Sequence, residues 1–260
     1  MQIFTKEYWL DACKELKSLK RLAFAALICA LTVVLDAYAT ITIIPGSLQV
    51  KCTFIVIALG CAVYGPVAAG FIAIVVDTLS YFLFSGGYGY FPGYMITEII
   101  VSLFYCFFLY RKKITVYRLF FAKLCTNFLA HLLLNSLWNS ILMEEGYLYH
   151  FWNGLIKNAV LLPFEVLILA LLFGAVLPLF SKAGLLPAHN EEDLSRLSLR
   201  SGGFTVLGLT ALLGCLCCLY PILSGSYVLL FSILSVLLLG GGIALLILSR
   251  KKPKEKVEEE

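Results

Sequence analysis

The chain has 260 residues, of which 61% are apolar and only 14% are charged, with 20 basic against 16 acidic side chains. Soluble domains carry about 25% charged residues, so this composition excludes an ordinary soluble domain. Long, nearly uncharged runs separated by short polar breaks instead predict an all-α, polytopic membrane helix bundle. The net charge of +4 comes mainly from loops and tails. It therefore reports orientation in the membrane and implies no nucleic-acid partner.

Apolar runs predict six membrane spans within residues 22–180, which would form one bundle. The spans are Leu22–Tyr38, Cys52–Tyr64, Val67–Phe84, Met95–Tyr110, Leu119–Leu142 and Leu155–Phe180. The second and third come from one apolar stretch in which Gly65-Pro66 predicts a turn, and a single tilted span is the alternative. Counting two spans keeps the basic leader at 1–21 on the same, cytoplasmic side as Arg111-Lys112-Lys113.

A cleaved signal peptide is the alternative interpretation of the first span. Ala37-Tyr38-Ala39 resembles a cleavage site. However, the charged leader is long for a signal peptide, and Asp36 lies close to the apolar stretch. We therefore expect this helix to be retained in the mature protein.

After residue 180 the sequence predicts a cytoplasmic linker at 181–203, an extra transmembrane hairpin at 204–249 and a charged tail at 250–260. This topology places eighteen of the twenty basic residues inside. We therefore expect a multi-pass protein of the bacterial cell membrane with both termini in the cytoplasm. Lys51 and Lys157 are the two exceptions, and the orientation rule does not explain them.

Polar side chains recur every four residues along the fifth span, at Asn127, His131, Asn135 and Asn139, with Trp138 beside the outer end. This spacing places them on one helical stripe, which should face other helices or a hydrated cavity because lipid offers no hydrogen bonds. For the deeper pair, hydrogen bonding between helices and contact with a ligand stay open. For Asn135 and Asn139, nearer the outer mouth, we expect contact with a ligand.

The sixth span carries Lys157 next to Asn158. A lysine at the midplane of a membrane costs about 2.5–3.5 kcal/mol unless it is paired or hydrated. Lys157 is therefore a candidate for ligand binding, and the alternative is that its long stem carries the ammonium group to the headgroups. Asp77, Glu98 and Glu165 are candidate counter-charges, and the alternative is that they serve separate structural bonds.

The connection at 85–93 combines four glycines with Tyr88, Tyr90 and Phe91. Such a loop can turn sharply and present a flat aromatic surface on which a ring could stack. An aromatic belt at the membrane interface is the alternative, because tyrosine is common at headgroup level.

Small residues in the first span, Ala26 and Ala30, form a small-xxx-small pattern that would let another helix approach closely. Apolar helices often contain this spacing, so the pattern is weak by itself. It gains weight only together with the resemblance that follows.

Seven short segments carry a resemblance to a known family, in matching order and spacing over roughly residues 22–180. They are Val63-Tyr-Gly-Pro66, Val76-Asp77-Thr-Leu, Phe84-Ser-Gly-Gly87, Phe91-Pro-Gly93, Leu134-Asn135-Ser-Leu-Trp138, Ile156-Lys157-Asn158 and Leu162-Pro163-Phe-Glu165. With these segments the sequence resembles the folate-type substrate-binding component (S component) of energy-coupling factor (ECF) vitamin transporters. One departure is Gly154, where members often carry a basic residue.

The resemblance implies a six-helix bundle that binds a vitamin in an outward-open pocket and has neither enzymatic activity nor a cofactor or metal of its own. It also implies docking, through Ala26 and Ala30, onto an ECF transmembrane coupling subunit and a pair of ABC-type ATPases. The sequence agrees, since it holds no Walker motif and no nucleophile elbow.

Folate combines a flat pterin with an anionic tail, so its site needs amides, stacking rings and a cation in one cavity. The residues predicted to bind it are Asp77, Tyr90, Phe91, Asn135, Trp138, Asn139, Lys157 and Asn158. The nearest alternative is an S component for another vitamin. An intramembrane enzyme using His131, Glu98 and Glu165 is a further alternative, but one histidine makes a poor metal site.

Overall fold

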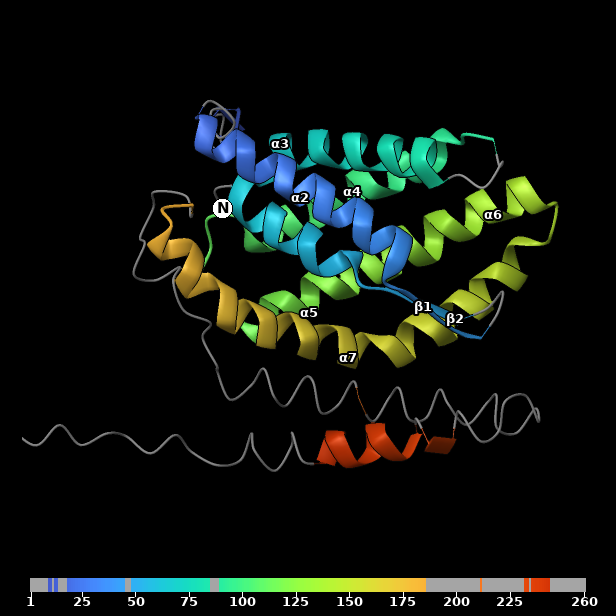
Figure 1. Ribbon diagram of the computed structural model, residues 1–260. Helices are drawn as coiled ribbons and strands as arrows, with labels where there is room; N and C mark the ends of the chain where they lie inside the picture. The colour runs from blue at the N-terminus through green and yellow to red at the C-terminus, as the bar shows by residue number, and fades with distance from the viewer. Residues whose placement is uncertain are drawn as a thin grey trace, which may run out of the picture.

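The computed structural model describes residues 9–10, 12–13, 18–44, 48–84, 89–185, 211, 232–233 and 235–243. Within these residues, five helical segments are long and apolar enough to cross a membrane. They pack together as a bundle (Figure 1). The leader and the predicted linker, extra hairpin and tail after residue 180 lie largely outside the described residues, as do residues 85–88 of the glycine-rich connection.

The elements of the bundle follow one another with short connections. They are α2 (Leu19–Tyr38), β1 (Thr40–Ile44), β2 (Leu48–Lys51), α3 (Thr53–Phe84), α4 (Pro92–Leu109), α5 (Val116–Cys125), the π-helix η3 (Thr126–Leu134), α6 (Asn135–Met143) and α7 (Tyr147–Lys182). The predicted all-α membrane bundle is confirmed. The sequence analysis did not predict the small antiparallel sheet of β1 and β2, in which Thr40 pairs with Lys51.

Helix α2 is an integral part of this bundle. It begins after Ser18, whose side-chain oxygen accepts a hydrogen bond from the backbone N–H of Arg21 at 3.2 Å and so satisfies one of the free N–H groups of the first turn. One face of α2, which includes Ala25 and Ile28, is buried against Val56, Val63 and other residues of α3. This packing supports a retained helix rather than a cleaved signal peptide.

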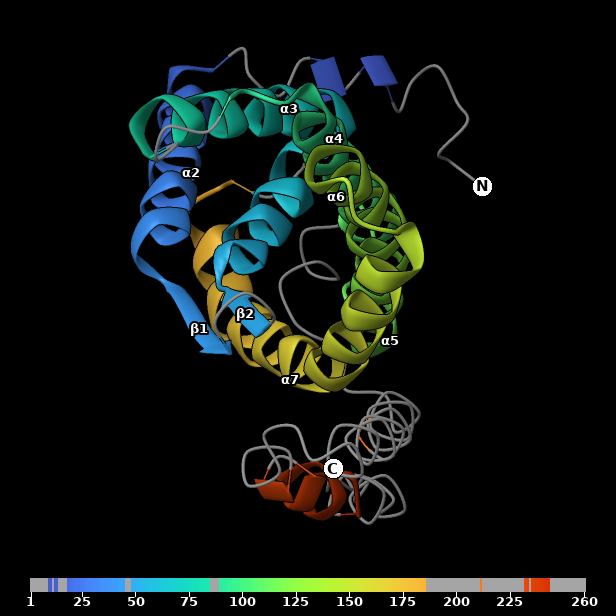
Figure 2. The ribbon, with the colours of Figure 1, turned by 90° about the vertical axis from the view of Figure 1, so that its right-hand side faces the viewer.

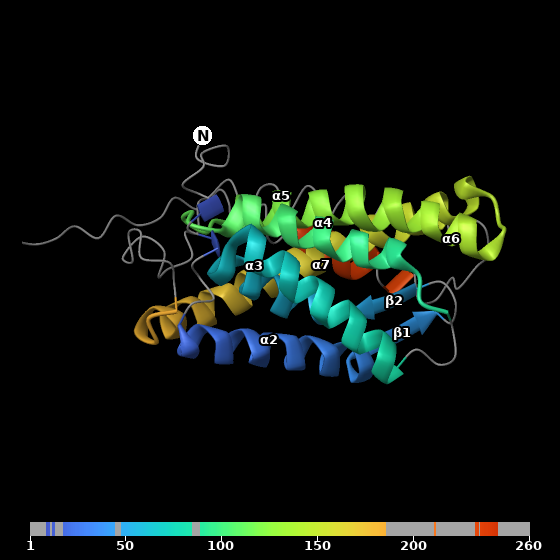
Figure 3. The ribbon, with the colours of Figure 1, turned by 90° about the horizontal axis from the view of Figure 1, so that it is seen from above.

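The long element α3 consists of two helices joined at Gly65, where φ is +73° and ψ is −179°. The Tyr64 hydroxyl donates to the carbonyl oxygen of Arg21 at the start of α2, at 2.6 Å. The ring of Phe84 lies 6.2 Å from that of Tyr38 at the other end of α2. The chain therefore reverses at Gly65, as predicted, and the two halves of α3 run in opposite directions (Figure 3).

Counting the two halves of α3 separately, the five segments become six membrane helices within the described residues. The first half, Thr53 to Tyr64, is only about 18 Å long at 1.5 Å per residue. This is shorter than the hydrocarbon core of a bilayer, which is about 30 Å thick. The strands β1 and β2 precede this short helix and lead the chain back from the end of α2.

The fifth span is one continuous helical rod made of α5, η3 and α6, since the residues at both junctions, Cys125–Thr126 and Leu134–Asn135, keep right-handed helical angles. Its middle third is a π-helix, which the sequence analysis did not predict. Helices of this type are rare in proteins, and those that do occur often lie at functional sites.

The sixth span, α7, starts at Tyr147 and not at the predicted Leu155. The extra residues are mostly aromatic or polar, so the prediction from apolar runs left them out. Glu144 ends α6 in the left-handed conformation at φ +57°, and the chain turns over 144–146.

The bundle has two chemically different ends. One, here called the basic end, holds Lys20, Arg21, Arg111, Lys112, Lys113, Arg118 and Lys182. The Lys20 ammonium donates to the carbonyl oxygen of Ala183 and ties the start of α2 to the end of α7 at this end. The other, here called the β end, carries the two strands, the start of α4 and the α6–α7 connection. Figure 2, seen from the β end, shows α2, α3, α4, α6 and α7 in a ring.

A polar chamber and its vestibule

A cavity of about 670 Å³, here called the chamber, lies inside the bundle. Residues from α2, α3, α4, α5, η3, α6 and α7 line it, so every membrane helix contributes to its wall. The lining includes five acidic residues, three lysines and five asparagines. A polar lining of this kind inside an apolar bundle marks a substrate pathway or binding site more often than a structural feature.

A second cavity of about 520 Å³, here called the vestibule, adjoins the chamber at the β end. The two cavities share Asp36, Lys51, Asp77, Ser80 and Tyr94. Because common residues form part of both walls, the chamber and the vestibule are neighbours at the β end.

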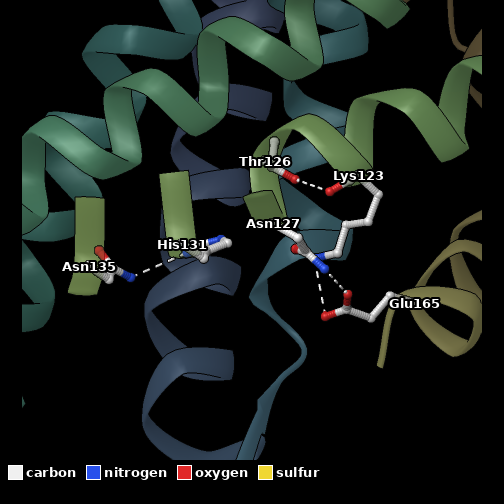
Figure 4. A network of polar contacts seen from close by, with 6 residues as sticks. All are labelled: Lys123, Thr126, Asn127, His131, Asn135 and Glu165. Carbon is white, nitrogen blue, oxygen red and sulfur yellow. Dashed lines mark hydrogen bonds and ion pairs between the residues drawn. The ribbon is translucent and has the colours of Figure 1, made fainter. Parts of the chain in front are cut away.

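The predicted polar stripe lines the chamber. Asn127, His131, Asn135 and Asn139 all contribute to its wall. Since a π-helix bonds residue i to i+5, its turn is wider than that of an α-helix, and residues four apart stay on one face. Within the stripe, Asn135 Nδ2 lies 3.4 Å from His131 Nδ1 (Figure 4). Asn135 Oδ1 is buried without a hydrogen-bond partner in the described residues.

The deep part of the chamber is closed by a buried network (Figure 4). Lys123 Nζ lies 3.2 Å from Glu165 Oε1, and Asn127 Nδ2 donates to Glu165 Oε2 at 2.8 Å. Lys123 Nζ also lies 4.2 Å from the centroid of the Phe54 ring. Asn127 thus serves as a polar contact between helices, and Glu165 is the counter-charge of Lys123 rather than of Lys157.

Lys157 and Asn158 line the chamber from α7. Neither side chain makes a hydrogen bond or an ion pair within the described part of the chain. None of the candidate counter-charges forms an ion pair with Lys157 in the described residues, and Asp77 and Glu165 instead follow the alternative of separate bonds, to Tyr90 and Lys123. The ammonium group of Lys157 is left available to a ligand in the chamber.

Charged pairs lie at the junction of chamber and vestibule. Lys51 Nζ lies 2.8 Å from Asp36 Oδ1, which joins the end of β2 to α2. The Tyr90 hydroxyl donates to Asp77 Oδ2 at 3.3 Å, and burial together with the Asp77 charge raises the pKa of Tyr90. The Asp36 partner explains Lys51, which the orientation rule left without an explanation.

Comparisons with known proteins identify this arrangement. The family described as "ECF transporter, substrate-specific component" matches residues 20–183, which run from α2 to the end of α7. The chain belongs to this family. It is also similar to the "Folate transporter FolT" of Clostridium novyi (strain NT), with 29% identity over 116 residues, or 45% of this chain and 67% of the relative.

A solved structure described as "Crystal structure of FolT bound with folic acid" shares the fold of this S component. The TM-score is 0.54 and the identity is 27%, over 58% of this chain and 91% of the other. The match confirms the predicted family and the six-helix architecture. The chain is thus a multi-pass membrane transport component rather than an enzyme.

The S component places most of the predicted site residues on the two cavities. Asp77, Asn135, Asn139, Lys157 and Asn158 line the chamber. Tyr90 and Phe91 line only the vestibule, where Asp77 also lies.

Trp138 lies on neither cavity wall among the described residues. Its Nε1 donates to Thr97 Oγ1 at 3.1 Å, and its ring lies 5.7 Å from that of Phe91. The expectation that Trp138 binds the ligand as part of the pocket wall is therefore not met, and the residue instead packs against the start of α4 through Thr97 and Phe91. Gly93 permits this packing, because a Cβ there would lie 2.8 Å from Trp138 Cδ2.

Helix α4 supplies lining residues that the sequence analysis did not assign to the ligand site, among them Tyr94, Thr97, Glu98 and Tyr105. The signal was present, since polar residues recur every three to four positions along an otherwise apolar span. Tyr94 donates from its hydroxyl to Asn139 Oδ1 at 2.6 Å and so orients one of the predicted site residues.

Ala26 and Ala30 lie on the exposed face of α2, opposite the face that packs on α3. Leu27 and Leu31 are exposed on the same side. The small-residue pattern is thus available to another helix, as docking requires.

Proposed function

We propose that this S component captures folate or a reduced folate from outside the cell for ATP-driven uptake. The observation that carries the proposal is the chamber, which combines asparagine amides with the unpaired ammonium group of Lys157 and adjoins an aromatic vestibule. Its volume of about 670 Å³ is typical of pockets for small ligands, which span about 300–1,000 Å³. The similarity to two folate-binding proteins of the family supports this choice of vitamin.

The chemistry of folate matches the lining. The pterin and the amide link offer donors and acceptors to Asn135, Asn139 and Asn158, and the glutamate tail offers carboxylates to Lys157. An amide group can both donate and accept, so it suits a heterocycle that carries both kinds of group. Tyr90 and Phe91 at the vestibule provide aromatic faces for the approaching ring system.

The charge distribution supports an orientation with the β end outside. Seven of the described basic residues lie at the basic end, whereas the β end has Lys51, which is paired with Asp36. Cytoplasmic loops carry the excess of lysine and arginine in membrane proteins. In this orientation the vestibule faces the outside, where the vitamin is captured.

Transport itself would come from partners. We propose that the exposed face of α2, through Ala26 and Ala30, contacts an ECF transmembrane coupling subunit that carries a pair of ABC-type ATPases. Small residues let two helices approach closely in a membrane, where association depends on packing and not on the hydrophobic effect.

Equilibrium binding of radiolabelled folic acid to the purified protein in detergent tests the vitamin. We expect saturable binding that unlabelled folate displaces and that riboflavin, thiamine and biotin leave unchanged. A protein that unfolds cooperatively on heating, yet binds one of the other vitamins and not folate, would support the alternative of a different substrate.

A further inference from the structure

The acidic residues that line the chamber differ in whether the protein supplies them with a partner. Asp36 pairs with Lys51, Asp77 accepts from Tyr90, and Glu165 pairs with Lys123. Glu145, at the rim, lies 3.2 Å from His150 Nε2. Glu98 makes no hydrogen bond or ion pair with any residue that the structure describes.

The position of Glu98 is fixed by its neighbours on α4. Thr97 donates to the carbonyl oxygen of Gly93 and accepts from Trp138, and Tyr94 is bonded to Asn139. These contacts hold the helix against α6 and leave the carboxylate of Glu98 without a partner, and deeper on the same wall the Tyr105 hydroxyl also has no hydrogen-bond partner in the described residues. The side chain of Glu98 is half-buried, and a carboxylate inside a membrane bundle without a partner costs free energy, so a ligand that supplies hydrogen-bond donors would recover that cost.

Lys157, on α7, carries the opposite charge and also has no partner in the described lining. The two groups do not pair with each other, although both line the same chamber and carry opposite charges. The chamber thus presents an acceptor on the α4 wall and a donor on the α7 wall. A ligand that fits both has a donor-rich edge at one place and an anionic group at another.

We propose that Glu98 binds the aminopyrimidinone edge of the pterin, accepting hydrogen bonds from its 2-amino group and its N3–H, while Lys157 binds a tail carboxylate. The two parallel N–H groups of this edge match the two oxygens of a carboxylate in the way that the guanidinium group of arginine does. This assignment rests on the proposed function, and it names the side chain that recognises the pterin.

A comparison of two ligands tests the assignment. One is folic acid, and the other is its 2-desamino-2-methyl analogue, which keeps the tail and lacks the 2-amino donor. The wild-type protein should bind the analogue at least about tenfold more weakly, since a hydrogen bond to a charged group contributes about 1.5–3 kcal/mol. Equal affinity of the wild-type protein for both ligands would overturn the assignment without the need for any variant.

The variant Glu98→Gln keeps the size of the side chain and removes its charge. We expect it to bind folic acid roughly 10- to 150-fold more weakly, and to bind the analogue, which keeps the N3–H donor, more weakly by a smaller factor. Because the substitution removes an unpaired charge, the ligand-free variant should unfold at the same temperature as the wild-type protein or higher. Glu98→Met serves the same comparison if the glutamine variant does not purify in folded form.

The control is Glu144→Gln, which removes an exposed carboxylate that lines neither cavity and should leave the ratio of the two affinities as in the wild-type protein. Loss of both ligands by the same factor in Glu98→Gln, with a lower unfolding temperature, would assign Glu98 a structural role and overturn the proposal. Absence of folic acid binding by the folded wild-type protein is a different result, which overturns the proposed function itself.

Discussion

Lys123 and Glu165 form an ion pair inside the membrane bundle, with their side chains only 3% and 12% exposed. The pair joins α5 to α7, and Asn127 adds a hydrogen bond from η3 to the same carboxylate. Every formal charge in this part of the chamber wall therefore has a partner. Lys157 and Glu98, in contrast, have no partner in the described residues. We therefore assign a structural role to the charges of Lys123 and Glu165, and a role in ligand binding to those of Lys157 and Glu98.

Breaking this pair on one side should destabilise the protein. Lys123→Met leaves Glu165 charged and buried, and Glu165→Gln leaves Lys123 in the same position, so each should cost about 3–5 kcal/mol of unfolding free energy. In the double variant no charge is left without a partner. Its loss of unfolding free energy should therefore be smaller than the sum of the losses in the two single variants. Thermal unfolding of the four proteins in one detergent measures this coupling. Strictly additive losses would show that the two charges do not interact.

The turn at Gly65 makes a prediction about backbone geometry. Its angles, φ +73° and ψ −179°, lie in a region that is essentially restricted to glycine. A Cβ at this position would also lie 2.8 Å from the Tyr110 ring. Gly65→Ala should therefore cost about 1–3 kcal/mol from backbone strain, with the clash added to it.

Gly70, in the second half of α3, is the matched control for Gly65, because a Cβ there meets nothing within 4 Å. Gly70→Ala in a helix should be neutral or stabilise the protein by up to about 1 kcal/mol. The unfolding temperatures of the two variants show whether the loss comes from backbone strain at Gly65 or from a general effect of replacing glycine by alanine in α3. Equal losses in both would contradict the role of the turn.

The sequence predicted the parts of this fold that depend on hydrophobicity and on glycine geometry. Each apolar run within residues 22–180 became a membrane helix, and Gly65-Pro66 divided one of them because proline and a glycine at positive φ interrupt a helix. The π-helix was not predictable from the apolar pattern, since a four-residue spacing of polar groups fits both helix types. The strands β1 and β2 are short and depend on the positions of the helices that flank them.

The site was predictable where a polar residue interrupts an apolar helix, as for Asn135 and Lys157. It was not predictable where two such residues satisfy each other, because pairing depends on how the helices pack. Lys123 looked like a cytoplasmic charge but lies buried beside Glu165. Trp138 was assigned to the pocket wall from its neighbours in sequence, whereas its indole N–H is committed to Thr97.

Lys157 should hold the anionic tail of the ligand. Lys157→Ala is expected to weaken folic acid binding roughly 10- to 150-fold, since a charge-assisted hydrogen bond contributes about 1.5–3 kcal/mol. 6-Hydroxymethylpterin carries no carboxylate and should bind this variant about as well as it binds the wild-type protein. Lys182→Ala, in the last turn of α7, is the matched control with unchanged affinity. Native folic acid affinity in Lys157→Ala would favour the alternative in which the lysine reaches the headgroups.

The exposed face of α2 should mediate docking. Ala26→Trp or Ala30→Trp is expected to reduce co-purification with the coupling subunit and to leave folic acid affinity intact, because the added bulk blocks close helix approach outside the chamber. Leu171→Trp, at an exposed position of α7, is the control for a bulky residue on another outer face. Loss of ligand binding together with docking would point to misfolding, and retention of both would place the docking face elsewhere.

Orientation in the membrane is the last prediction. With six membrane helices in the described bundle, the connection at 144–146 should lie outside and the one at 110–115 inside, as the positions of the basic residues require. A membrane-impermeant maleimide applied to intact cells should label Glu144→Cys. Lys113→Cys should react only after the cells are permeabilised, and the wild-type protein gives the background of the native cysteines. Both substituted positions are exposed in the structure, so a lack of labelling cannot be explained by burial of the cysteine. Labelling of Lys113→Cys from outside would reverse the orientation and place the vestibule on the cytoplasmic side, where it could not capture a vitamin from the medium.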